Sequence, residues 1–324
     1  MLTKMRHFVL QNNVVFLLLL LILCFGSTTG PLFLNEQNLH NIARQISFDI
    51  PLALALTIVL VAGGIDLSVG SVLSMAAALT MGLQPLGTWL AVGVALLFGA
   101  AVGLINGLLV TKGRIVPFIA TLGTMTVVRG AMLTYTRQQP IPGSDPAFTF
   151  WGAGSLGPVP VPILVVALLC VGVHLLLTYT QFGRNLYAIG GNADAAFLAG
   201  IQIERNKVMA FVLSGLLAAV SGVLIASRLN ASTVHIGLDS GLWAIAAAII
   251  GGASLTGGKG STLGAVLGVV TLGVLVNGMN LLGVHTYYQI GVRAVILIAV
   301  VAVDALSAAN LRKKLVMQSY GNRE

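Results

Sequence analysis

The sequence predicts an all-α membrane protein with about ten transmembrane helices and both termini in the cytoplasm. Of its 324 residues, 57% are hydrophobic and 8% are charged, whereas an ordinary soluble domain carries roughly a quarter charged residues. Apolar runs of membrane-spanning length recur from one end of the chain to the other. Lysine and arginine concentrate in alternate connecting segments, which is the distribution that membrane topology imposes.

Apolar periodicity and helix-breaking residues divide the chain into ten predicted helices. These helices cover residues 8–26, 46–62, 67–84, 88–110, 115–136, 160–180, 207–228, 239–256, 261–283 and 286–306. The short connections at 63–66 and 84–87 are also compatible with a broken or re-entrant helix. We therefore expect a single domain over 1–324, in which 8–306 form the membrane bundle and 307–324 form a basic cytoplasmic tail.

The basic residues orient this bundle. If the N-terminus is cytoplasmic, three arginines fall in outside segments, namely Arg44, Arg137 and Arg228. Twelve basic residues fall in inside segments: Lys4, Arg6, Lys112, Arg114, Arg184, Arg205, Lys207, Lys259, Arg312, Lys313, Lys314 and Arg323. This bias predicts that both termini are inside. Because these charges are scattered and do not cluster with aromatic residues, the net charge of +8 does not indicate a nucleic-acid partner.

Two connecting segments carry distinctive patterns. The inside segment 181–207 contains a short amphipathic stretch that includes Asp194-Ala195-Ala196-Phe-Leu-Ala-Gly200. The stretch Gly63-Gly-Ile-Asp-Leu-Ser-Val-Gly-Ser71 places helix-breaking glycines beside polar groups at the end of an apolar run. Transporters place substrate-binding groups at such breaks. A tight turn in which Asp66 caps the next helix explains the same residues, so both interpretations stay open.

These two stretches and three others resemble one family. The others are Phe118-Ile-Ala-Thr-Leu-Gly123, Gly251-Gly-Ala-Ser-Leu-Thr-Gly-Gly-Lys-Gly260, and Asn277-Gly-Met-Asn-Leu-Leu-Gly283 followed by Tyr287-Tyr-Gln289. In this order they are similar to the permease subunits of bacterial ABC importers for ribose, xylose and arabinose. The resemblance implies a multi-pass permease of the bacterial inner membrane, with Asp194, Ala195, Ala196 and Gly200 in a coupling helix.

The same resemblance implies three partners: a cytoplasmic ABC ATPase subunit, a periplasmic sugar-binding protein, and a second permease copy that is either identical or related. The chain itself lacks a phosphate-binding loop, because Ala253 and Gly260 occupy positions where that motif needs Gly and Ser or Thr. We therefore expect no enzymatic activity, no cofactor and no metal site. One departure from the family is Gly241, where these permeases commonly carry a glutamate, so the resemblance does not identify the sugar.

Polar and aromatic side chains inside the apolar helices are candidates for the sugar pathway, because such groups are expensive in lipid and tend to face a cavity or a partner. The candidates are Asp66, Phe118, Trp243, Asn277, Asn280 and Gln289. Hydrogen bonds between neighbouring helices use the same residue types, so a packing role is open for each of them.

The alternative function is an ion-gradient-driven secondary carrier. Such a carrier needs carboxylates in the middle of the membrane. The aspartates nearest to apolar spans are Asp49, Asp66, Asp239 and Asp304, and we expect all four close to helix ends. This expectation favours the importer.

Overall fold

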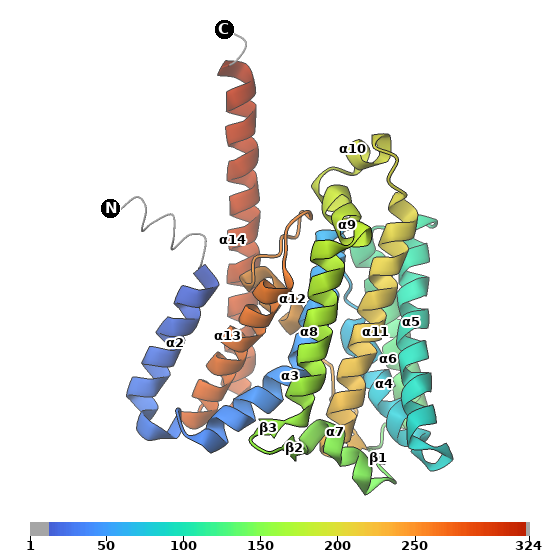
Figure 1. Ribbon diagram of the computed structural model, residues 1–324, viewed down its shortest axis with the longest axis vertical. Helices are drawn as coiled ribbons and strands as arrows, with labels where there is room; N and C mark the ends of the chain where they lie inside the picture. The colour runs from blue at the N-terminus through green and yellow to red at the C-terminus, as the bar shows by residue number, and fades with distance from the viewer. Residues whose placement is uncertain (1–12, 322–324) are drawn as a thin grey trace.

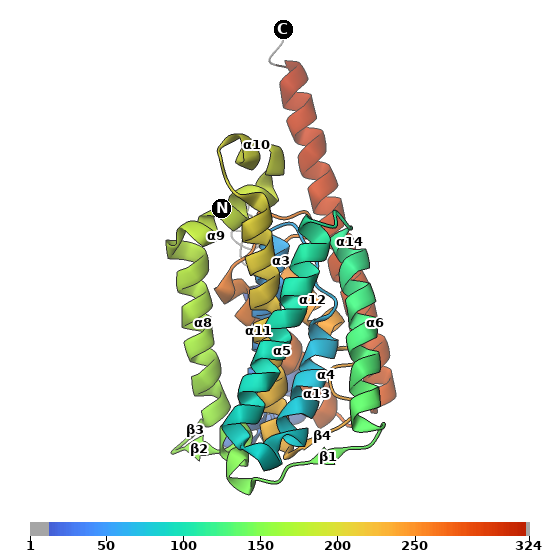
Figure 2. The same cartoon turned by 90° about the vertical axis from the view of Figure 1, so that its right-hand side faces the viewer.

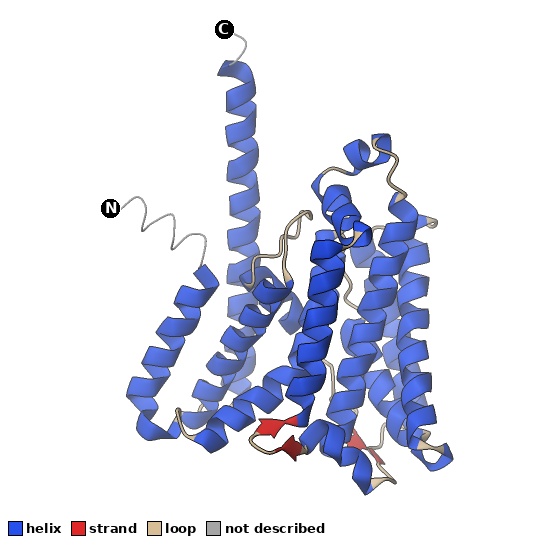
Figure 3. Cartoon of the chain, in the orientation of Figure 1, coloured by secondary structure: helices blue, strands red, loops and turns tan. Residues whose placement is uncertain are grey.

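The computed structural model describes residues 13–321, which are almost entirely helical (Figure 3). The long helices are α2 (Asn13–Thr29), α3 (Glu36–Val61), α5 (Thr88–Thr111), α6 (Pro117–Thr136), α8 (Val161–Tyr179), α11 (Ile203–Leu229), α13 (Thr262–Leu281) and α14 (Thr286–Gly321). The shorter ones are α4 (Val69–Gly82), α7 (Thr149–Ala153), α9 (Gln181–Gly191), α10 (Ala193–Leu198), α12 (Ser240–Ile250) and the 3-10 turns η1 (Gly30–Leu32), η2 (Gln84–Leu86) and η3 (Pro146–Phe148).

Six of the described helices are long and apolar enough to cross a membrane. They comprise Val14–Leu32 together with α3, α5, α8, α11 and α13. Three further helices are apolar but shorter: α4, α12 and the first part of α14, Thr286–Ala302. The helices confirm the predicted all-α membrane architecture.

The core of the bundle lies around α3, α4 and α12. Every residue of α4 from Val69 to Met81 is buried, which is the pattern of a helix surrounded on all sides by protein. α11 packs against α3, α4 and α5. In contrast, the apolar windows of α5 and α8 are only 28% buried, and these helices lie at the periphery of the bundle (Figure 2). Their exposed leucines form a surface suited to lipid.

Four two-residue strands lie at the end of the bundle opposite α9 and α10 (Figure 1). β1 (Ile141–Pro142) pairs antiparallel with β4 (Ala231–Ser232), so that Ile141 faces Ser232. β2 (Ser155–Leu156) pairs with β3 (Val159–Pro160). Together with α7, these strands order the long proline-containing connection between α6 and α8.

Several predicted helix boundaries were wrong. α3 begins at Glu36 and not at residue 46, because the Asn35 side chain caps it by accepting a hydrogen bond from the Gln37 amide, 3.1 Å. α12 ends at Ile250, where Gly251 and Gly252 interrupt it, and does not continue to residue 256. α14 continues through Gly321, so 307–321 are helical. The predicted start of the first helix at residue 8 lies outside the described residues.

These boundaries also correct the predicted positions of two carboxylates. Asp49 lies near the centre of α3, and Asp304 lies inside α14. The sequence had suggested helix ends for both, because hydropathy alone did not recognise the polar residues that extend these helices. The central position of Asp49 bears on function and is considered below.

Candidate functional site

The predicted coupling segment forms two short helices that project from one end of the bundle (Figure 1). The Thr180 side chain caps α9 by accepting a hydrogen bond from the Gly183 amide at 3.1 Å. Asn192 caps α10 in the same way, through a 3.0 Å bond from the Ala195 amide to its Oδ1. Each cap satisfies a helix N-terminal amide that would otherwise have no partner. The local sequence therefore sets where both helices begin.

Gly200 ends α10 in a left-handed conformation. Its φ is +80°, which glycine adopts without steric strain. The Gly200 amide donates to the Phe197 carbonyl at 2.9 Å, and the Ile201 amide donates to the Ala196 carbonyl at 3.0 Å. This pair of bonds is a Schellman motif. Ala196 is buried, whereas Asp194, Ala195 and Gly200 are exposed.

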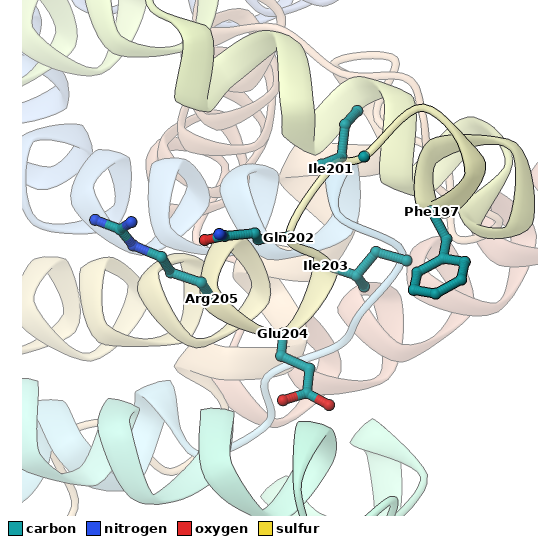
Figure 4. A pocket seen from close by; sticks show the side chains of 7 residues that line it. Phe197, Ile201, Gln202, Ile203, Glu204 and Arg205 are labelled. Carbon is teal, nitrogen blue, oxygen red and sulfur yellow. The ribbon is translucent and has the colours of Figure 1, made fainter.

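The most exposed apolar side chains of this segment are two that the sequence analysis did not single out. Phe197 is 70% exposed and Leu198 is 86% exposed. Beside them is a hollow of about 630 Å³ lined by Phe197, Gly200, Ile201, Gln202, Ile203, Glu204 and Arg205. Phe197 and Ile203 lie near each other, and Arg205 extends away from them (Figure 4). An apolar tip beside charged groups is the composition of a protein-docking surface.

α9 is fixed to the bundle by close backbone contacts. The Tyr187 hydroxyl donates a 2.7 Å hydrogen bond to the Gly260 carbonyl. Burial raises the pKa of the Tyr187 phenol, which keeps this donor protonated. The Gly258 amide donates to the Val61 carbonyl at 3.0 Å, and Gly190 packs directly against both of these backbone groups. The two glycine-rich stretches, near 63 and near 257, therefore meet under α9.

The turn between α3 and α4 is built around Asp66, whose side chain is completely buried. One carboxylate oxygen accepts hydrogen bonds from the amide and hydroxyl of Ser68, at 3.0 and 2.6 Å. The other accepts from the Ser214 hydroxyl of α11 at 2.8 Å. Asn106 of α5 donates to the Ser68 hydroxyl at 2.8 Å. Asp66 thus joins the turn to α5 and α11.

The other predicted pathway residues have separate surroundings. Asn277 exchanges two hydrogen bonds with Asn38, at 2.8 and 2.9 Å, which link α13 to α3. Gln289 donates to Asn280 at 2.7 Å. Phe118 is 49% exposed at the start of α6. Trp243 is half-buried under a guanidinium group of α14. The structure does not gather these side chains around one point.

A non-helical segment enters the bundle before α12, and the sequence analysis assigned it no role. Arg129 of α6 donates to the Val234 carbonyl, and the Ser74 hydroxyl of α4 donates to the Ile236 carbonyl. Gly237 packs against the backbone of Gly70. Irregular backbone at membrane depth requires such protein partners or water. An arginine inside an apolar helix was the sequence signal for this arrangement.

Residues 38–301 match the model of a family described as the permease component of branched-chain amino acid transport systems. The chain belongs to this permease family. The matched range runs from α3 into α14, so it includes the projecting helices, the glycine contacts and the Asp66 turn. The permease is therefore a multi-pass membrane protein.

Curated relatives of the permease match it over nearly their whole length. It is 42% identical to the ribose import permease protein of Bacillus subtilis (strain 168), over 94% of this chain and 97% of that one. It is 36% identical to the D-allose transport system permease protein of Escherichia coli (strain K12), over 90% of each chain. It is also 36% identical to the galactose/methyl galactoside import permease protein of the same strain, over 94% of this chain and 96% of that one. No solved structure matches the chain. The resemblance to sugar-importer permeases is confirmed.

Proposed function

We propose that this permease forms the transmembrane path of an ATP-driven importer for a monosaccharide, such as a ribose-like pentose, a hexose or a related polyol. The observation that carries the proposal is its near full-length similarity to transport permeases whose names specify ribose, allose and galactose, two of them as import permeases. Because those three sugars differ, the similarity supports the class of substrate and not one member of it.

The proposed topology has about ten membrane crossings and cytoplasmic termini. It is supported by the charges at the two ends of the bundle. Arg184 of α9 and Arg205 and Lys207 of α11 lie at the end of the bundle that carries the projecting helices. Arg137 directly follows α6, and Arg228 is in the last turn of α11, so both lie near the strands. Under the positive-inside rule, the projecting helices are cytoplasmic.

In this orientation α10 docks on the cytoplasmic ABC ATPase subunit. Asp194, Ala195 and Gly200 lie on its surface, Ala196 holds it against the following turn, and Phe197 and Leu198 supply the apolar contact. α9 then transmits motion, because its Tyr187 hydroxyl is bonded to the loop between α12 and α13 and its Gly190 packs against both that loop and the end of α3. A rigid connection of this kind converts closure of the ATPase into helix movement.

Two further partners complete the proposed importer. A periplasmic sugar-binding protein would deliver the sugar at the strand end of the bundle, and a second permease copy, identical or related, would form the other half of the path. Hydrolysis of ATP belongs to the ATPase subunit, since the glycine-rich stretch around Lys259 lacks the nucleotide-binding pattern.

A second candidate function, the ion-gradient-driven carrier, is favoured by one observation. Asp49 lies near the centre of α3, and carriers use carboxylates at this depth to bind protons or sodium. The neighbouring Arg293 provides a fixed positive charge close to Asp49, which opposes the binding of a cation there. The importer therefore remains the preferred function.

The proposed coupling is tested by co-purification with the ATPase. Leu198→Asp places a charge on the exposed tip of α10 without disturbing buried groups, and we expect it to abolish co-purification and ATP-dependent uptake. Leu86→Asp is the matched control, because Leu86 is 73% exposed and belongs to η2, whose Gln84 side chain accepts a hydrogen bond from the Ser144 amide next to β1. Equal retention of the ATPase by both variants would refute the role of α10.

A further inference from the structure

Side chains from three helices lie near one another inside the bundle. The Arg293 guanidinium of α14 lies over the ring of Trp243 of α12, 5.0 Å from the ring centroid. Arg293 also attracts Asp49 of α3 electrostatically. A cation, an anion and an indole ring are thus brought together, although they are far apart in the sequence.

This cluster lies near the middle of the bundle. Asp49 is close to the centre of the 26-residue helix α3, and the preceding Phe48 carbonyl accepts a hydrogen bond from the Ser221 hydroxyl inside α11. Further along α12, Ala247 packs against Gly268 of α13, so Trp243, one turn before Ala247, is level with the central part of α13. Charged groups at such depth rarely face lipid, because removal from water costs several kcal/mol. The cluster therefore faces protein or a water-filled space.

The side chains of this cluster have exposed surface and an unused hydrogen-bond donor that a ligand could contact. Asp49, Trp243 and Arg293 are all half-buried and not fully enclosed. The Arg293 Nε is buried and has no hydrogen-bond partner within the described residues. Asp239, one helical turn before Trp243, is exposed.

We propose that Asp49, Trp243 and Arg293 form a contact site for the sugar within the membrane. This inference rests on the proposed function. Arginine and carboxylate groups donate to and accept from neighbouring sugar hydroxyls, while the indole covers an apolar part of the sugar ring. A site with few polar groups binds weakly, which suits a path that must release its cargo.

Trp243 itself provides the reporter for a binding experiment. The chain has three tryptophans, so a Trp89→Phe and Trp151→Phe background leaves only Trp243. D-ribose, D-allose and D-galactose are titrated against this permease in lipid nanodiscs without ATPase or binding protein. We expect a saturable fluorescence change with at least one sugar and none with polyethylene glycol. Asp49→Asn is expected to weaken binding about tenfold, which corresponds to about 1.4 kcal/mol.

Arg293→Gln in the same background is expected to weaken binding similarly, and Arg137→Gln, outside the cluster, to leave it unchanged. Should Arg293→Gln not fold, Asp49→Asn carries the test, as judged by a monodisperse elution profile. The site is overturned if none of the three sugars changes the fluorescence. It is also overturned if Asp49→Asn binds sugar as tightly as the Trp89→Phe and Trp151→Phe permease without that change.

ATP-driven uptake by the complete importer is measured in parallel. If uptake persists while the fluorescence response is absent, the site is wrong and the importer stands; if uptake is also absent, the proposed function fails.

Discussion

The contact between α9 and the glycine-rich turns leads to a prediction that separates two adjacent glycines. A Cβ atom at Gly190 would overlap the Val61 carbonyl oxygen and the Gly258 amide nitrogen, the two groups that share a 3.0 Å hydrogen bond. Overpacking of this kind costs about 1–3 kcal/mol. Loss of the hydrogen bond adds about 1 kcal/mol. Gly190→Ala should therefore either move α9 away from the bundle or strain the backbone of α9 and of the two turns that it contacts.

The matched control is Gly191→Ala, because a Cβ there has no heavy atom within 4 Å. This variant should be neutral to within about 0.5 kcal/mol. Both variants are compared by thermal unfolding in detergent and by sugar molecules accumulated per ATP hydrolysed in proteoliposomes. We expect Gly190→Ala to unfold at a lower temperature and to hydrolyse ATP with reduced uptake. If the two variants are indistinguishable in both assays, the proposed transmission through α9 is refuted.

Three further predictions concern buried polar groups. Asp66→Ala leaves several buried donors without an acceptor, at about 1–3 kcal/mol each, and should sharply reduce folded yield; normal yield and unfolding temperature would contradict the role given to it. Asn38→Ala and Asn277→Ala should each weaken thermal stability, and the double variant should cost less than the sum of the two; strict additivity would show that the amides do not interact. Arg129→Gln should release the segment near Val234, measured as faster amide hydrogen exchange there, and an unchanged exchange rate would rule this out.

The fold could be predicted from sequence where apolar periodicity was unbroken. The positions of α5, α6 and α13 follow from long apolar runs ended by glycine, proline or charged residues. The beginning of α3 could not be found in this way, because its first turns, from Glu36 to Arg44, are polar and depend on the Asn35 cap. This single error hid the central position of Asp49.

The candidate site was predictable only in part, because a sequence pattern reports local structure and not contacts between distant segments. The coupling segment is local, so its short pattern indicated the position of α9 and α10. The partner of Asn277 is Asn38, 239 residues away, and periodicity carries no information about such pairs. The stretches around Gly63 and Gly257 are far apart in the sequence, and their contact beside Gly190 depends on close backbone packing. The role of Trp243 in the sugar pathway stays a prediction.

The most direct test of the central claim is sugar accumulation by the reconstituted importer in the absence of any ion gradient. Proteoliposomes that contain the permease, its ATPase and its binding protein are loaded with ATP or with a non-hydrolysable analogue, and uptake of D-ribose, D-allose and D-galactose is measured. The account predicts accumulation of at least one sugar with ATP only, and its loss in Leu198→Asp. Accumulation that does not depend on ATP, and that requires an imposed proton or sodium gradient, would contradict the importer and support the carrier.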